Sequence, residues 1–150
     1  MGRKARAVVD TYAIIADLTG QATSRAAELL EGVRLGSIEG ILHYLVVYEL
    51  SYHWRRGRLP FRDEEELLDF IDSYFTVKAL DNVIAVKASG VKLLGDQLLA
   101  KAEDPRLRRR RLSVADATTI AIAMMENAPI VTGDADLSYV ARNLGIGIIW

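Results

Sequence analysis

The sequence predicts an α/β fold built on a parallel sheet, and two observations carry this prediction. Short apolar runs that are typical of buried strands alternate along the chain with longer segments of helical periodicity. The first run, Ala7–Val9, is continuously apolar, as expected of a central strand covered by helices on both faces. This alternation is typical of α/β domains. Because the 150 residues contain no internal repeat and no linker, we expect residues 1–150 to form a single domain.

Five strands are expected. The second contains three aliphatic residues between positions 38 and 42, and the fourth is the run between Pro129 and Gly133. The predicted strands cover residues 7–9, 37–43, 75–80, 129–132 and 145–150.

Helices are expected between these strands because helical periodicity there is bounded by start and stop residues. A short helical turn ends at Thr19-Gly20, and the helix after His43 is stopped by Gly57 and Pro60. Acids at 63–66 complement the dipole of the next helix start. Residues 102–112 are expected to be a charged connection that contains Pro105. The predicted helices cover residues 12–18, 23–31, 44–56, 82–101 and 113–127, one that starts near 63, and one that ends near 144.

Composition excludes several classes of protein. There is no cysteine, so disulfides and cysteine-ligated zinc are excluded. The longest runs without charge, residues 40–48 and 117–125, are too short to span a bilayer. We therefore expect a cytoplasmic protein with no membrane contact. With a net charge of −1, the molecule as a whole neither attracts nor repels nucleic acid strongly.

Four acidic residues stand where a site can form. Asp10 and Asp134 each follow a predicted strand, at the edge where ligands collect in open α/β sheets. Glu49 lies on an apolar helix face, and Asp116 lies near the head of an apolar helix. Each also has a structural interpretation: Asp10 as a helix N-cap, Ser113–Asp116 as a capping box, residues 133–136 as a capping turn, and Glu49 as a surface residue.

Together these acids indicate a metal site. Four carboxylates brought together without a counter-ion would repel one another, and some would take up protons. A divalent cation removes that conflict, and ligation by oxygen alone selects Mg²⁺ or Mn²⁺ over zinc. We therefore expect the other three acids to converge on Asp10.

With these acids in this order, the sequence resembles the PIN-domain family of metal-dependent ribonucleases, particularly the VapC-like toxins of VapBC-type toxin–antitoxin pairs. The resemblance covers essentially the whole chain. It is carried by four motifs in order, which are Val8-Val9-Asp10-Thr11, Glu49-Leu50, the segment 112–117 and the segment 131–137.

The resemblance implies a five-stranded parallel sheet between helices and a site of three or four acids that holds Mg²⁺ or Mn²⁺. Carried over, Asp10, Glu49, Asp116 and Asp134 are the catalytic, metal-binding acids, with Asp136 as a possible extra ligand. The small polar positions beside the site are Thr11, Ser113 and Thr132. The main departure is Tyr12, where many relatives carry a small residue or asparagine.

The activity so implied is metal-dependent endonucleolytic hydrolysis of RNA. A bound ion lowers the pKa of a water, which attacks the phosphorus in line, and the ions neutralise charge on the leaving oxygen. A small antitoxin protein is the expected partner. The number of ions stays open.

A run of arginines before the helix that carries Asp116 is a candidate RNA-binding segment, because guanidinium groups suit phosphate geometry. The alternative is a solvated loop. The run contains Arg106, Arg108, Arg109, Arg110 and Arg111. A homodimer is expected through the helices that carry a surplus of large apolar residues, namely Tyr48, Tyr52, Trp54 and Phe70.

Two other functions remain open. A phosphatase of the haloacid-dehalogenase type also begins with an acid at a strand end, but it needs a second aspartate where Tyr12 stands. A non-catalytic RNA-binding or regulatory protein on the same fold is disfavoured, without being excluded, by the four intact acids.

Overall fold

The computed structural model describes residues 4–150, so the first three residues of the predicted domain lie outside the described residues. The strands are β1 (Ala5–Val9), β2 (Ile38–His43), β3 (Phe75–Lys78), β4 (Ile130–Val131) and β5 (Ile148–Ile149). The helices are α1 (Thr11–Leu18), α2 (Ser24–Arg34), α3 (Tyr44–Arg55), α4 (Glu64–Tyr74), α5 (Asn82–Ala100), α6 (Pro105–Arg108), α7 (Val114–Glu126) and α8 (Ala135–Asn143).

The five strands form one sheet in the order β3-β2-β1-β4-β5, and every pairing is parallel. The predicted five-stranded parallel sheet is therefore confirmed. Val8 pairs with Ile41 on one side and with Ile130 on the other, so β1 is central. The chain adds strands outward from β1 in one direction and then resumes at β4 on its other side. The carboxyl ends of β1 and β4 form the topological switch point, where open α/β sheets bind ligands.

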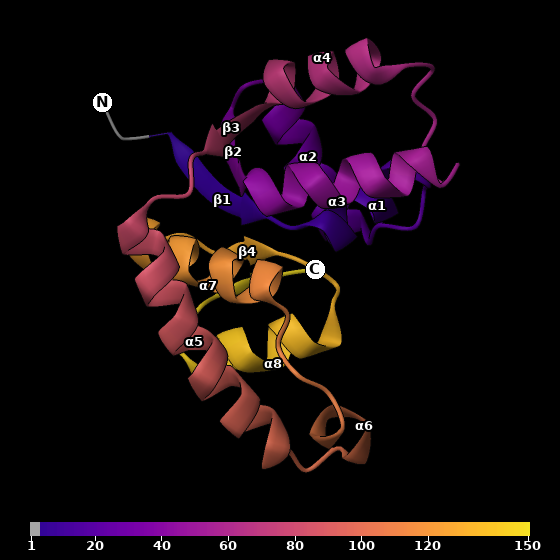
Figure 1. Ribbon diagram of the computed structural model, residues 1–150. Helices are drawn as coiled ribbons and strands as arrows, with labels where there is room; N and C mark the ends of the chain where they lie inside the picture. The colour runs from indigo at the N-terminus through magenta and orange to yellow at the C-terminus, as the bar shows by residue number, and fades with distance from the viewer. Residues whose placement is uncertain (1–3) are drawn as a thin grey trace.

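Alternation along β1 divides the core into two halves. Val8 packs into one apolar cluster with α5, α7 and α8, while Ala7 and Val9 pack into the other with α1, α2 and α3. Figure 1 shows the corresponding layers, with α1–α4 on one side of the sheet and α5, α7 and α8 on the other. The predicted three-layer α/β/α arrangement is confirmed.

The connection between α5 and α7 differs from the expectation, because it contains the short helix α6. Asp104 caps this helix through the backbone N–H of Arg106, and Pro105 occupies its first turn, where a missing N–H costs nothing. The sequence indicated only a charged connection at 102–112 and did not reveal this helix, because proline next to a charged run resembles a loop.

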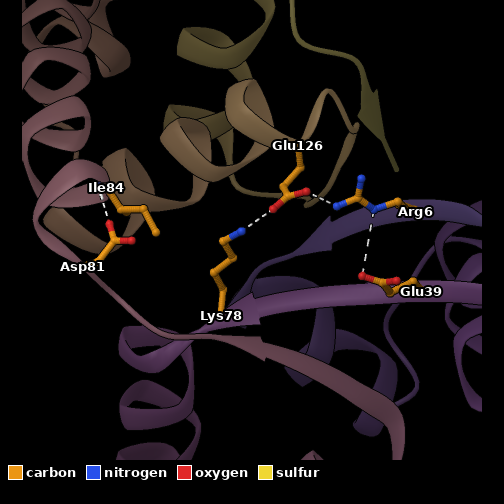
Figure 2. Close-up of polar contacts among 6 residues, drawn as sticks. All are labelled: Arg6, Glu39, Lys78, Asp81, Ile84 and Glu126. Carbon is orange, nitrogen blue, oxygen red and sulfur yellow. Dashed lines mark hydrogen bonds and ion pairs between the residues drawn. The ribbon is translucent and has the colours of Figure 1, made fainter.

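Helix α7 is fixed at both ends. At its start, the backbone of buried Leu112 is held by α5: its N–H donates to Asp96 at 2.8 Å, and Lys92 donates to its carbonyl oxygen at 2.8 Å. At its end, Glu126 forms ion pairs with Arg6 of β1 and Lys78 of β3, as Figure 2 shows. The start of α7, which carries Asp116, is therefore fixed to α5, and its end is fixed to β1 and β3.

Within residues 4–150, no helix is both long enough and apolar enough to cross a membrane.

Candidate active site

Asp10 lies at the centre of the switch point and is only 4% exposed. It follows β1 directly, and its Oδ1 accepts from the N–H of Ala13 at 2.9 Å, so Asp10 is also the N-cap of α1. The capping interpretation is therefore correct, but it uses only one carboxylate oxygen. The other, Oδ2, accepts from the Thr132 hydroxyl at 2.5 Å.

Thr132 connects the ends of the two strands at the switch point. It is fully buried, and its hydroxyl also accepts from the N–H of Asp134 at 3.0 Å. One side chain thus links Asp10 after β1 to the backbone of Asp134 after β4. Asp134 in turn caps α8, where one carboxylate oxygen accepts from the N–H of Leu137 at 2.9 Å.

Glu49 reaches the same region from α3. It is half-buried, and its Oε1 accepts from the Thr11 hydroxyl at 2.6 Å. Because Thr11 is the first residue of α1, this bond ties the middle of α3 to the end of β1. Glu49 is therefore not a freely solvated surface residue.

Asp116 lies in the first turn of α7, where Ser113 is the N-cap and accepts from the N–H of Asp116 at 3.0 Å. This bond uses the backbone of Asp116, so its carboxylate is not needed to start the helix. The side chain instead lines a cleft of about 480 Å³. The capping-box interpretation accounts for Ser113 and leaves Asp116 available for chemistry.

All four acids line this one cleft, at the carboxyl edge of the sheet. Helices α1, α3 and α7 and the turn before α8 supply its walls. Its lining residues include Asp10, Thr11, Tyr12, Gln21, Glu49, His53, Ser113, Asp116, Thr119 and Asp134. Among the described residues that line it, there is no lysine or arginine.

The pKa values of the acids in the cleft reflect burial first and the charges of the neighbouring acids second. Burial is the main cause that raises the pKa of Asp10 to about 8, and the charges of Asp116 and Asp134 raise it further, against hydrogen bonds from Thr132 and Ala13 that lower it. Burial also raises the pKa of Asp116 to about 7, with added repulsion from Asp134 and Glu49. Perturbed carboxylates that share a cleft are typical of functional sites.

The donor chemistry fits a hard divalent cation, since four carboxylates offer oxygen ligands of the kind that Mg²⁺ and Mn²⁺ prefer. A cation would also relieve the repulsion between Asp10, Asp116 and Asp134. In the present side-chain arrangement of residues 4–150, no three acidic or histidine side chains lie close enough to hold an ion.

Asp136 has a different environment from the other acids. It is 8% exposed, and one of its carboxylate oxygens accepts from Arg110 at 2.9 Å. It is not among the described residues that line the cleft. This ion pair ties the segment before α7 to the start of α8, so the expected extra ligand is already neutralised here by a cation.

The arginine run divides into tethered and untethered side chains. Arg106 pairs with Asp104, and Arg108 donates to the carbonyl oxygens of Ala102 and Glu103. Arg110 is held by Asp136. Arg109 and Arg111 are exposed, and no hydrogen bond or ion pair within residues 4–150 involves either side chain.

Several lining residues were not singled out as site residues from sequence, because their types are common on any surface. Gln21 and His53 are examples. Thr119 has a partner that sequence spacing could not reveal: its hydroxyl lies 2.9 Å from Nε2 of buried His43. Burial lowers the pKa of His43 to about 4, so this ring is neutral and has a structural role.

The aromatic residues expected at a homodimer interface do not all face solvent. Tyr48 and Tyr52 are 69% and 49% exposed. Trp54 is half-buried and donates to the carbonyl of Phe61, while Phe70 packs on Phe61 and Phe75. Two of the four therefore contribute to the protein's own packing.

Comparison with known proteins connects this geometry to a family. The family description "PIN domain" matches residues 7–143. A search of curated proteins found no match.

Similar solved structures include PAE2754 from Pyrobaculum aerophilum, with a TM-score of 0.60 and 17% identity over 97% of this chain and 83% of that one. The structure of VapBC2 from Rickettsia felis bound to a promoter DNA fragment has a TM-score of 0.65 and 14% identity, over 95% of this chain and 96% of that one. The structure of FitAcB from Neisseria gonorrhoeae has a TM-score of 0.51 and 14% identity, over 94% of each chain. These likenesses establish the fold. The match over residues 7–143 establishes the family, and this chain belongs to the PIN domain family.

Proposed function

We propose that this protein is a metal-dependent endoribonuclease and the toxin of a toxin–antitoxin pair. The observation that carries the proposal is the cleft at the β1–β4 switch point, which four carboxylates line without a lysine or arginine among its described lining residues. PIN domains are generally nucleases that use divalent metal ions, and this is the ligand chemistry that such a cleft fits.

Asp10, Glu49, Asp116 and Asp134 would hold Mg²⁺ or Mn²⁺. The bound ion supplies charge neutralisation at the phosphate and lowers the pKa of a water. The chain's own contribution is to keep these ligands in place: Thr132 holds Asp10 from β4, and Thr11 holds Glu49 from α1. Ser113 fixes the first turn of α7, and with it the position of Asp116.

RNA would reach the cleft past the segment that precedes α7. Arg109 and Arg111 are the cations of the run without a tether among the described residues, so they are the arginines expected to contact phosphates. Arg106, Arg108 and Arg110 hold the segment in shape through their own contacts. Such a nuclease would act in the cytoplasm.

A protein partner is proposed from two sources. The sequence resembles toxins of the VapBC type, and VapBC2 is among the similar structures. We therefore propose a small antitoxin as the partner that controls the cleft. Homodimerisation would use the exposed face of α3, where Tyr48 and Tyr52 lie one helical turn apart.

The test is incubation of the purified protein with transfer RNA, ribosomal RNA and synthetic single strands in Mn²⁺, Mg²⁺ or EDTA. Cleavage with either ion and none in EDTA is the expected result. Cleavage that persists after exhaustive chelation would contradict the metal mechanism. Binding without cleavage under every condition would favour the non-catalytic RNA-binding alternative.

A further inference from the structure

Tyr12 occupies an unusual position for a large aromatic residue. It lies in the first turn of α1, two residues after Asp10, and it is 48% exposed while lining the acidic cleft. A half-exposed aromatic side chain next to carboxylates contributes little burial energy to the fold. The buried face of α1 is already formed by residues that include Ala13 and Ile14. Core packing therefore does not explain this residue.

The ring of Tyr12 is nevertheless held firmly. It makes an edge contact with Trp150, with ring centroids 5.4 Å apart and an interplanar angle of 74°. Trp150 is half-buried and packs against the core cluster on the α1–α3 side of the sheet. The ring of Tyr12 therefore packs against Trp150, a residue that itself packs against the core.

Gly133 makes this arrangement possible. A Cβ atom added to it would lie 2.5 Å from the Trp150 ring and 2.6 Å from the Tyr12 ring, closer than real Cβ contacts allow. Only glycine lets both rings rest on the turn between Thr132 and Asp134. The turn that presents Asp134 therefore also supports the aromatic pair, and the two features form one surface.

The charge of the cleft indicates what this surface would bind. Acids without cations repel the phosphates of an RNA strand, so affinity near the metal ligands has to come from uncharged contacts as well as from the ion. Stacking of a base on an aromatic ring is such a contact, and it contributes about 1–3 kcal/mol per base. It also selects unpaired bases, because a base inside a duplex has no free face.

We propose that Tyr12, supported by Trp150 and Gly133, forms a subsite that stacks one unpaired nucleobase of the RNA beside the scissile phosphate. This inference rests on the proposed ribonuclease function and deepens it, because it makes the substrate a single-stranded or looped RNA. Tyr12 is then a residue that determines specificity, and no part of the proton or metal chemistry depends on it.

The test uses short single-stranded RNA that carries 2-aminopurine, whose fluorescence is quenched when it stacks, bound to the full chain in EDTA so that no cleavage occurs. The parent and Tyr12→Phe should bind with equal affinity and quench the probe at one position along the strand. Tyr12→Ala should bind about tenfold more weakly, because one stacked base is lost, and should leave the probe unquenched.

The matched control is Tyr44→Ala. Tyr44 is 55% exposed, which is comparable to Tyr12, but it is not among the described residues that line the cleft. It should bind and quench as the parent does. A thermal melt of each variant checks the fold, and the retained quenching in Tyr12→Phe separates loss of the ring from loss of structure. An abasic nucleotide at the quenched position should weaken the parent about tenfold and Tyr12→Ala not at all.

Two outcomes would overturn the inference in distinguishable ways. If the parent binds RNA and cleaves it with Mn²⁺, but Tyr12→Ala has unchanged affinity and quenching, the stacking subsite is wrong and the ribonuclease stands. If the parent neither binds nor cleaves any RNA, the proposed function fails and the subsite fails with it.

Discussion

At its C-terminal end, helix α7 carries Glu126, which contacts Arg6 and Lys78 and is surrounded by opposite charge (Figure 2). At its N-terminal end, the same helix carries Asp116, and the charges that act on it most strongly belong to Asp134 and Glu49. At one end a half-buried carboxylate is neutralised by two cations, while at the other end carboxylates share a cleft, where burial and mutual repulsion raise the pKa of Asp10 and Asp116. The contrast separates an acid that holds the fold together from acids kept at a cost in stability, as functional groups often are.

The largest expected effect is on cleavage. Asp116→Asn should lower the rate of RNA cleavage by a hundredfold or more, because it removes a proposed metal ligand, while Ser113 still caps α7. Glu126→Gln should cleave at the parental rate but lose about 1–2 kcal/mol of unfolding free energy, because Arg6 and Lys78 lose their partner. Initial rates with Mn²⁺ and urea unfolding measure the two effects. Parental cleavage by Asp116→Asn would mean that this end of α7 is as structural as the other.

The next effect is the stabilisation that a metal ion provides. At about a hundredfold excess of Mn²⁺ over its dissociation constant, the parent and Glu126→Gln should each gain about 2–3 kcal/mol of unfolding free energy. Asp116→Asn should gain much less, since it has one ligand fewer. Thermal melts with Mn²⁺ and with EDTA provide the comparison. An equal gain in all three proteins would place the ion away from α7.

A smaller effect concerns pH in the absence of metal. The pKa of Asp10 is raised to about 8 and that of Asp116 to about 7, both from 3.8, so between these values the folded protein binds more protons than the unfolded chain. The contribution of these two groups to stability should therefore be greatest below about pH 4 and be lost as pH rises toward about 8. Asp10→Asn should flatten this fall and raise the melting temperature at about pH 8 by several degrees, because asparagine still caps α1. Melts in EDTA across this range decide the point, and an unchanged slope in the variant would contradict the pKa assignment.

The smallest effect is the response to salt, which should have opposite signs at the two ends of α7. Raising NaCl from about 0.05 to about 1 M screens attraction around Glu126 and repulsion around Asp116. Without metal, Asp116→Asn should stabilise the fold, because it removes repulsion from Asp134 and Glu49. This gain and the loss caused by Glu126→Gln should each shrink by about 0.5 kcal/mol at the higher salt concentration. Urea unfolding in EDTA at the two salt concentrations measures this. Effects that do not change with salt would mean that charge is not what distinguishes the two ends.

The sequence by itself determined the order of the strands and of every helix except α6, together with the strand ends that carry Asp10 and Asp134. It could do so because burial patterns and turn residues act over a few neighbouring positions. It also indicated Glu49, an acid on an apolar helix face. These local signals were enough to predict that the four acids lie at one edge of a parallel sheet.

Only the tertiary structure decided which partner each side chain has. Thr132 bonds to Asp10 across 122 positions of sequence, and Arg110 pairs with Asp136 across 26. Nothing in local periodicity distinguishes Asp136, which is neutralised by an arginine, from Asp134, which lines the cleft. The support of Tyr12 by Trp150 likewise depends on the packing of segments far apart in the chain. Such contacts follow from which elements pack together, and the short-range patterns that identify the elements contain no record of them.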